Sequence, residues 1–295
     1  MSEQRALFDE LGPRARRRSR AISGGVILLL AGLGALAALK LAENGQFSAQ
    51  KWSPLFNPLD SQFTTVWTFL GGGLRNTALA GGIAIALSLV IGTVLALARV
   101  TSRRWYRWAI VGVMEFFRAV PVVISIFFAS RFLPTIGVDL PLLWYLVVGL
   151  VLYNSIAIAE IVRAGILAVP RGQTEASAAL GLSGAQNLWL VVLPQAFRLM
   201  LPSLISQLVI VVKDTALGFI IGFEELLRRG EIAVQTLGNP LQMYLLIGML
   251  FFVVNSLVSA LAQRVESGMR QRNGSRQSPP ATLRTGFLRV PALRS

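Results

Sequence analysis

Long apolar segments alternate with short polar segments along the chain, and their lengths predict helices that cross a membrane. A helix needs about 20 mostly apolar residues to span the hydrocarbon core of a bilayer. Six segments meet this requirement: 22–41, 76–98, 108–133, 140–159, 199–223 and 241–263. The pattern therefore predicts an all-α integral membrane protein with six transmembrane helices.

The distribution of lysine and arginine predicts the side of the membrane that each connection faces. Basic residues are enriched in the cytoplasmic loops of membrane proteins. If the N-terminus is cytoplasmic, the inside segments hold twenty of them, whereas the outside connections hold three: Lys51, Arg228 and Arg229. Both termini and residues 163–198 are therefore expected to face the cytoplasm.

Composition agrees with a membrane protein and excludes several kinds of chemistry. The chain is 54% hydrophobic and 14% charged, against about 25% charged in a soluble domain. It has no cysteine and no histidine, which excludes disulfides and Ser-His or Cys-His nucleophiles and argues against a transition-metal site. The net charge of +14 comes from residues that flank apolar segments, so membrane topology explains it better than nucleic-acid binding does.

The two ends of the chain are expected to differ from its centre. Residues 1–21 form a basic cytoplasmic N-terminus before the helix at 22–41. That helix has the basic flank of a signal peptide, but its apolar run exceeds the usual length of about 7–15 residues, so an uncleaved anchor is predicted. Residues 264–295 are rich in Arg, Ser, Pro and Gly, which predicts a basic disordered tail that lies against anionic lipid.

The segment RGQTEASAALGLSGAQNLWLVVLP, residues 171–194, is small and polar although it separates two apolar helices. Pro170 and Gly172 are expected to end the preceding helix. Thr174 is then the expected N-cap of a new helix, with Glu175 in its first turn, where the helix dipole favours an anion. Gly181 is expected to end this helix as its C′ residue.

A second short helix is expected to follow and to run toward Pro194. Ser183 and Gln186 have the spacing of a capping box, which marks a helix start. The loop is thus predicted to contain two short helices with a bend between them. Its small side chains permit close approach of another protein, and an amphipathic connector on the membrane surface is the alternative.

The same loop carries a family motif. Glu175-Ala176-Ser177 is followed by Gly181 and then by Val191-x-Leu193-Pro194. This pattern resembles the cytoplasmic "EAA" loop of ABC importer permeases, with Ser177 in place of the family's second alanine. The resemblance assigns ATPase coupling to seven residues: Gln173, Glu175, Ala176, Ser177, Gly181, Leu193 and Pro194.

Further stretches resemble the polar amino acid branch of that family, which includes histidine, glutamine and glutamate importer permeases. They are AEIVRAGILAVPRGQTEA (159–176), EFFRAVPVVISIFF (115–128), VVKDTALGFIIGFEEL (211–226) and GLRNTALA (73–80). The resemblance covers residues 63–263. It implies a type I ABC importer permease fold with five core helices, to which 22–41 adds one.

Family membership implies partners and a mechanism. Such permeases pair with a sister permease or a second copy, two ATP-binding-cassette ATPase subunits and an extracytoplasmic solute-binding protein, in the bacterial plasma (inner) membrane. The chain has no G-x-x-x-x-G-K-[ST] phosphate loop, so ATP hydrolysis is expected in a partner and no cofactor in this chain. Alternating access driven through the loop is the implied mechanism.

Charged residues within the predicted helices are candidates for translocation or gating, because charges at membrane depth are costly and usually functional or paired. They are Glu115, Arg118, Arg131, Glu160, Arg163, Lys213 and Asp214. The first two and the pair Glu160–Arg163 have i, i+3 spacing, which favours structural ion pairs near the cytoplasmic helix ends, with gating as the alternative.

The remaining three candidates have different settings. Lys213 and Asp214 are adjacent in the middle of a predicted helix and point about 100° apart, which favours a buried structural or translocation role. Arg131 lies near an outer helix end, where it either attracts a substrate carboxylate or snorkels. Helix-distorting residues, Pro121, Gly149, Gly165, Pro202 and Gly218, are interpreted as packing features.

The substrate predicted is a polar amino acid, best a glutamate or a related acidic or amide amino acid, because the outer helix halves lack the acidic cluster that a cationic substrate needs. Two other functions stay open on the sequence. One is an ion-coupled secondary carrier, which predicts an inverted repeat that we do not find. The other is a membrane scaffold that does not transport.

Overall fold

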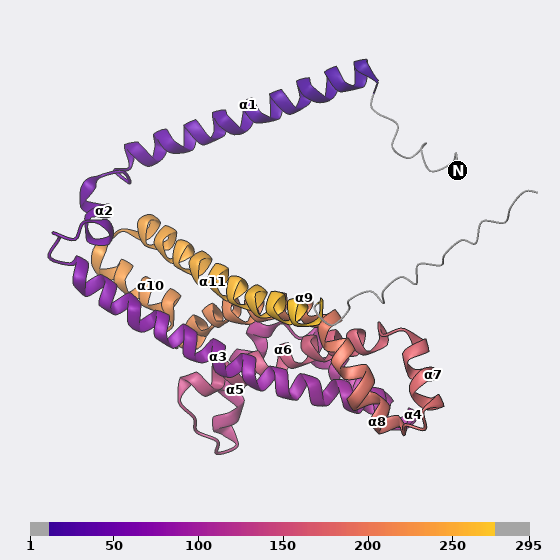
Figure 1. Cartoon of the computed structure of the whole chain (residues 1–295). Coiled ribbons are helices and arrows are strands. Elements are labelled where there is room, and N and C mark those ends of the chain that lie inside the picture. Colours follow the sequence, from indigo (N-terminus) through magenta and orange to yellow (C-terminus); the bar gives the residue numbers. More distant parts are fainter. Residues whose placement is uncertain (1–11, 275–295) are drawn as a thin grey trace, which may run out of the picture. The chain divides into compact units, whose positions relative to one another are not determined.

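The computed structural model describes residues 12–274, and its regular secondary structure in that range is helical (Figure 1). The helices, in chain order, are α1 (Pro13–Glu43), α2 (Ala49–Phe56), α3 (Phe63–Thr101), α4 (Arg104–Ala119), α5 (Val122–Thr135), α6 (Leu142–Leu167), α7 (Arg171–Ala179), α8 (Gly184–Gln186), the π-helix η2 (Asn187–Val192), α9 (Leu193–Asp214), the 3-10 helix η3 (Thr215–Ile221), α10 (Leu226–Leu237) and α11 (Pro240–Gly274). The all-α fold class is therefore confirmed.

The chain divides into two compact units. Within residues 12–274, one unit contains the residues up to Phe69 together with Gly230–Leu246, and the other contains Leu70–Arg229 and the residues from Ile247 onward. The predicted coupling loop and all the charged candidates lie in the second unit.

Five helices in the described range are long and apolar enough to cross a membrane. The predicted third span, 108–133, is not one continuous helix, so the prediction of a single helix there was wrong. It consists of α4 and α5, bent by 98°. If this bent pair counts as one span, the total is six, as the sequence predicts. Val120 has extended backbone angles and Pro121 precedes α5; the residue before a proline avoids helical geometry, which explains the break.

The predicted ends of two other segments also differ from the structure. The fifth span was expected at 199–223, but helical structure begins at Gly184 and continues without a gap to Ile221. The tail was expected from residue 264, but α11 continues to Gly274. Residues 275–295 lie outside the described range, as does the start of the predicted basic N-terminus.

The second unit is built around α5, α6 and α9, which pack closely at glycines. A Cβ at Gly149 of α6 would lie 2.5 Å from the Cα of Ile126 in α5, and one at Gly165 would lie 2.9 Å from Met200 in α9. A Cβ at Gly218 of η3 would similarly lie 2.9 Å from the Cδ2 methyl group of Leu146 in α6. These contacts confirm the interpretation of the three glycines as packing features, since only a missing side chain allows such approach.

In the first unit, polar contacts tie the segment after α1 to the corner between α10 and α11. The side-chain nitrogen of Asn239 donates to the Lys51 carbonyl at 3.0 Å, and that of Gln242 donates to the Gln46 carbonyl at 2.5 Å. Asn239 and Gln242 are both fully buried. By contrast, the most apolar stretch of α1 is not buried within the described chain.

Candidate functional site

The first helix of the 171–194 loop ends as the sequence predicts. Gly181 has a φ of +79°, and its N–H donates to the carbonyl of Ala178 at 2.9 Å, while the N–H of Leu182 donates to that of Ser177 at 3.1 Å. This is a Schellman motif, which satisfies the last carbonyls of α7. The C′ role predicted for Gly181 is therefore confirmed.

The start of that helix was predicted incorrectly. α7 begins at Arg171 with Pro170 as its N-cap, so Thr174 is not the cap and Gly172 lies inside the helix. Proline is well suited to the helix boundary because its fixed φ permits the turn into the helix. As a result, Glu175 lies in the second turn, and the α7 first turn holds no acidic residue.

The second part of the loop begins as expected but does not form a separate short helix. Ser183 accepts from the Gln186 N–H at 3.3 Å, and the Gln186 side chain accepts from the Ser183 N–H at 2.9 Å, so the predicted capping box is confirmed. From Gly184 onward α8, η2, α9 and η3 follow without a gap. The loop thus contains one separate helix, α7, and the first part of a long helix that continues beyond the loop.

Pro194 is accommodated within this long helix rather than ending it. A proline inside a helix lacks an N–H and clashes with the carbonyl four residues earlier. The preceding residues Asn187–Val192 form a π-helix, whose wider turn relieves that clash. π-turns of this kind are frequent at functional sites.

The residues predicted to couple to an ATPase differ in exposure. Glu175 and Ala176 are exposed on α7, whereas Ser177 is buried and its hydroxyl donates to the Thr174 carbonyl at 2.8 Å. Gln173 accepts from the Gln195 side chain at 3.3 Å, which joins α7 to α9. A cavity of about 900 Å³ opens beside this loop and is lined by residues such as Arg171, Thr174 and Trp189.

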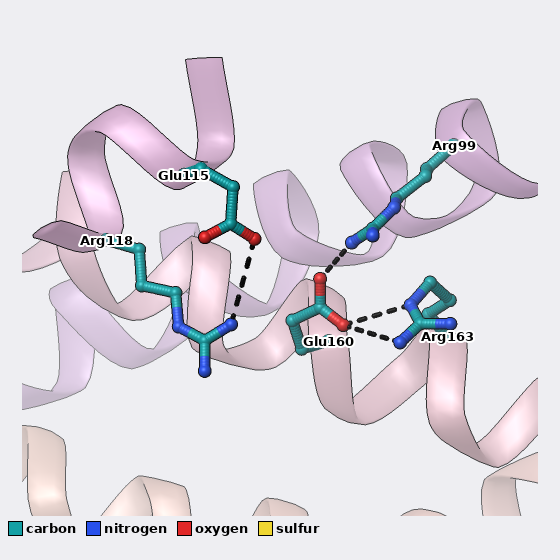
Figure 2. Close-up of polar contacts among 5 residues, drawn as sticks. All are labelled: Arg99, Glu115, Arg118, Glu160 and Arg163. Carbon is teal, nitrogen blue, oxygen red and sulfur yellow. Dashed lines mark hydrogen bonds and ion pairs between the residues drawn. The ribbon is translucent and has the colours of Figure 1, made fainter. Parts of the chain in front are cut away.

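The two predicted i, i+3 ion pairs are present but unequal (Figure 2). Arg163 donates to Glu160 at 2.9 Å from both its Nε and an Nη nitrogen. Glu115 and Arg118 lie 3.9 Å apart, with side chains 56% and 61% exposed. Water screens the second pair, so it contributes little to stability.

Arg99 completes the stronger cluster, although its place in the sequence did not indicate this role. Its guanidinium pairs with the other carboxylate oxygen of Glu160, which joins α3 to α6 (Figure 2). One carboxylate therefore serves two guanidinium groups. Glu160 and Arg163 also line a cavity of about 440 Å³ together with Ser203 of α9.

The other three charged candidates do not join this cluster. Lys213 and Asp214 are the last two residues of α9 and lie within the helical run that continues into the 3-10 helix η3. The Lys213 side chain is exposed and that of Asp214 is half-buried. Arg131 is exposed on α5, with its guanidinium carbon 5.3 Å from the centre of the Phe127 ring.

Sequence reasoning also missed a buried amide pair between α6 and α9. Gln207 donates to the Asn154 side-chain oxygen at 2.8 Å, and Asn154 donates to the Leu150 carbonyl at 2.9 Å. Both residues are buried. Polar side chains that bond across apolar helices hold them in one register, and the only sequence signal was a polar residue within each apolar run.

Comparison with known proteins identifies this arrangement. The family described as "Binding-protein-dependent transport system inner membrane component" matches residues 61–271. This chain belongs to that family. It is an amino-acid ABC importer permease, a multi-pass inner membrane protein without enzymatic activity of its own.

Individual relatives of this permease agree. It is 40% identical over 233 residues to the glutamate transport system permease protein GluD of Corynebacterium glutamicum, covering 78% of this chain and 84% of that protein. It is 31% identical to the probable glutamine ABC transporter permease protein GlnP of Bacillus subtilis, covering 67% and 92%. A solved structure described as "Crystal structure of an amino acid ABC transporter with histidines" matches with a TM-score of 0.65 and 27% identity, covering 71% and 98%. Permeases of this family work with ATPase subunits and binding proteins.

Proposed function

We propose that this permease transports glutamate or a closely related acidic or amide amino acid. The observation that carries the proposal is the 40% identity to a glutamate transport system permease protein. Another relative, 32% identical, is named for transport of glutamate, glutamine, aspartate and asparagine. No acidic residue occurs between Asp60 and Glu115, which fits a path that does not need to attract a cationic side chain.

The loop 171–194 couples the membrane helices to the ATPase subunits. Glu175 and Ala176 are exposed on α7, where a partner reaches them. α7 is held to the long helix by the Gln173–Gln195 hydrogen bond, and that helix continues without a gap from Gly184 to Ile221. A displacement of the loop therefore moves α9 directly, and α9 packs on α6 at Gly165.

This geometry suits alternating access. The two ATPase subunits close on ATP and carry the loop with them, so that the bundle opens toward the solute-binding protein, and hydrolysis reopens it to the cytoplasm. A sister permease or a second copy of this chain completes the pathway. The orientation that follows puts both termini, the loop and the Glu160 cluster on the cytoplasmic side.

The cluster of Arg99, Glu160 and Arg163 is proposed to gate the inner end of the path. It joins α3 to α6 and borders a cavity between α6 and α9, so movement of α9 changes its surroundings. Glu115, Arg118 and Arg131 are exposed and serve at the periphery. Lys213 and Asp214, at the junction with η3, remain candidates for the translocation path.

Substrate choice is tested by uptake into proteoliposomes that contain this permease with its ATPase, its binding protein and any sister permease. Radiolabelled glutamate is expected to accumulate only when ATP is present on the side of the membrane that corresponds to the cytoplasm. Unlabelled glutamate, aspartate or glutamine should compete, whereas arginine should not. Competition by arginine alone would refute the substrate proposal, and uptake driven by a sodium or proton gradient without the ATPase would refute the importer mechanism.

Coupling through the loop is tested with Glu175→Lys. The reversed charge on an exposed docking face should lower ATP-driven uptake at least tenfold and weaken ATPase retention during purification. Asp139→Lys is the matched control, because Asp139 is also exposed but lies outside the loop, between α5 and α6. Equal effects of the two variants, or labelling of position 175 from outside the cell, would contradict the proposal.

A further inference from the structure

A cavity between α6 and α9 brings charged and small side chains together at one open surface. Its volume of about 440 Å³ lies within the range of about 300–1,000 Å³ that small-molecule sites occupy. α6 contributes Glu160, Arg163, Ala164 and Ala168 to its lining, and α9 contributes Leu199 and Ser203. Because Ala164 and Ala168 are small and exposed, they leave space beside the charged pair for a ligand to enter.

The charged cluster at this cavity has two guanidinium groups and one carboxylate. Arg163 binds one oxygen of Glu160 with its Nε and one Nη nitrogen, both at 2.9 Å, and Arg99 binds the other oxygen (Figure 2). The three side chains therefore carry a net charge of +1, and within residues 12–274 no other charged residue lines the cavity. They are only 18–31% exposed, so this charge attracts an anion more strongly than it would in bulk water.

Two hydrogen-bond donors at the cavity have no partner among the described residues. One is the remaining Nη nitrogen of Arg163, since its other two nitrogens bind Glu160. The other is the hydroxyl of Ser203, which is exposed on α9; by contrast, the hydroxyl of Ser206 donates to the Pro202 carbonyl at 3.1 Å. A guanidinium and a hydroxyl are donors that a carboxylate accepts from readily, and the bond to the guanidinium is strengthened by charge.

We infer that this cavity binds a carboxylate of the transported amino acid near the cytoplasmic end of its path, and that Arg163 exchanges Glu160 for that carboxylate. Glu160 stays paired during the exchange because Arg99 holds its other oxygen, which avoids the cost of a partly buried carboxylate without a counterion. Ser203 donates from α9, so the bound amino acid joins α6 to α9. The cytoplasmic side and the choice of glutamate rest on the proposed function, whereas recognition of a carboxylate rests on the cavity itself.

The absence of cysteine from the chain allows a local test by ligand protection. Ala164→Cys places a thiol in the cavity, one helical turn from Glu160. In the assembled transporter without nucleotide, glutamate should slow the reaction of this thiol with a small water-soluble reagent, measured on the peptide that contains residue 164. The rate should fall about fivefold when the glutamate concentration is about four times its Kd. The diamide of glutamic acid, which has no carboxylate, should not protect.

Arg163→Gln and Arg118→Gln form a matched pair of variants. Each removes the guanidinium of an i, i+3 ion pair, but only Arg163 lines the cavity. In the Ala164→Cys background, Arg163→Gln should raise the glutamate concentration for half protection at least about tenfold, because a charge-assisted bond is lost, and Arg118→Gln should leave it unchanged. Arg163→Lys, which keeps the charge without the planar fork, should give an intermediate value and serves if Arg163→Gln fails to fold. A thiol at Ser206→Cys, which lies outside the cavity, should not be protected.

Several outcomes would overturn the inference. Protection by inorganic phosphate as strong as that by glutamate would make the cavity a general anion site, and protection by phosphatidylglycerol alone would assign it to a lipid headgroup. Protection that survives Arg163→Gln, or that extends equally to Ser206→Cys, would also contradict it. A transporter that imports glutamate without protecting Ala164→Cys would lose this site and retain its proposed function. If arginine competes for uptake and glutamate does not, the substrate proposal fails, and protection by arginine would still support the carboxylate site.

Discussion

Two glycines, one inside α7 and one just after its end, have different backbone conformations. Gly181 has a φ of +79°, whereas Gly172 lies in the first turn of α7 with negative φ and with nothing within 4 Å of its Cβ position. A left-handed residue with a side chain costs about 1–2 kcal/mol. A helical glycine, by contrast, is less stable than alanine. The two positions thus provide opposite tests of one loop.

Gly181→Ala should destabilise the loop by about 1–2 kcal/mol because alanine resists the Schellman conformation. ATP-driven uptake should fall and protease cleavage near residue 181 should increase. Gly172→Ala, the control, should stabilise α7 by about 0.5–1 kcal/mol and preserve transport. Equal loss of uptake in both variants would mean that the added side-chain volume on this surface, and not the backbone conformation at residue 181, impairs transport.

Glu160 and Glu115 offer a second matched comparison. Glu160→Ala leaves Arg99 and Arg163 without their shared carboxylate in a site where the three side chains are 18–31% exposed. Because water screens part of the charge, we expect a loss of about 1–3 kcal/mol, below the cost of breaking a fully buried pair. Glu115→Ala should cost less than about 1 kcal/mol. Thermal unfolding in detergent measures both.

At the scale of elements, the sequence predicted features that depend on neighbours along the chain. The capping box at Ser183 and the turn at Gly181 involve residues within a few positions of each other, so local chemistry determines them. Thr174 was misassigned because Pro170 began the helix earlier, and two valid start signals cannot be ranked without the structure. Hydropathy showed that residues 108–133 are apolar over the length of a membrane span. It carries no information on the direction of the helix axis, so the bend at Pro121 was missed.

Contacts distant in sequence were beyond the same reasoning. Arg99 and Glu160 are 61 positions apart, and the Asn154–Gln207 bond joins positions 53 apart. Each residue alone fits several partners, and only the packing of α3, α6 and α9 selects one. The family motif compensated for this at the loop, because its spacing identified the expected ATPase-coupling residues without requiring any contact to be known.

Helix packing makes a third prediction at this scale. Gly149→Ala puts a Cβ 2.5 Å from the Cα of Ile126, and backbone cannot yield as a flexible side chain does. Overpacking of this kind costs about 1–3 kcal/mol. Gly248→Ala in α11, where nothing lies within 4 Å of the Cβ position, should be neutral or stabilising. Thermal unfolding that ranks Gly248→Ala below Gly149→Ala would contradict the close approach of α5 and α6.

At the scale of the whole molecule, hydrogen bonds attach the segment between α1 and the start of the family match to the rest of the first unit. The family match begins at residue 61. Upstream of it, Gln46 and Lys51 accept hydrogen bonds from the buried side chains of Gln242 and Asn239. The apolar stretch of α1 contributes no burial within the described chain. The short segment after α1, and not α1 itself, therefore fastens the N-terminal part in the first unit.

Exchange of residues 22–39 for an unrelated Leu/Ala span of equal length should leave the thermal stability of the isolated permease unchanged, since topology is kept and no buried contact is lost. Asn239→Ala should reduce the stability by about 1–3 kcal/mol, because it leaves the Lys51 carbonyl without its donor. A large loss from the exchange alone would show that α1 packs within the chain.

The uninterrupted helix from Gly184 to Ile221 has a consequence for how this transporter fails. Under the proposed coupling through the loop 171–194, a helix without a break transmits displacement in both directions, so a stalled amino acid in the pathway should slow ATP hydrolysis, and ATP hydrolysis without substrate should be small. A pair of glycines introduced midway along that helix should separate the two rates, leaving a pump that consumes ATP while delivering nothing.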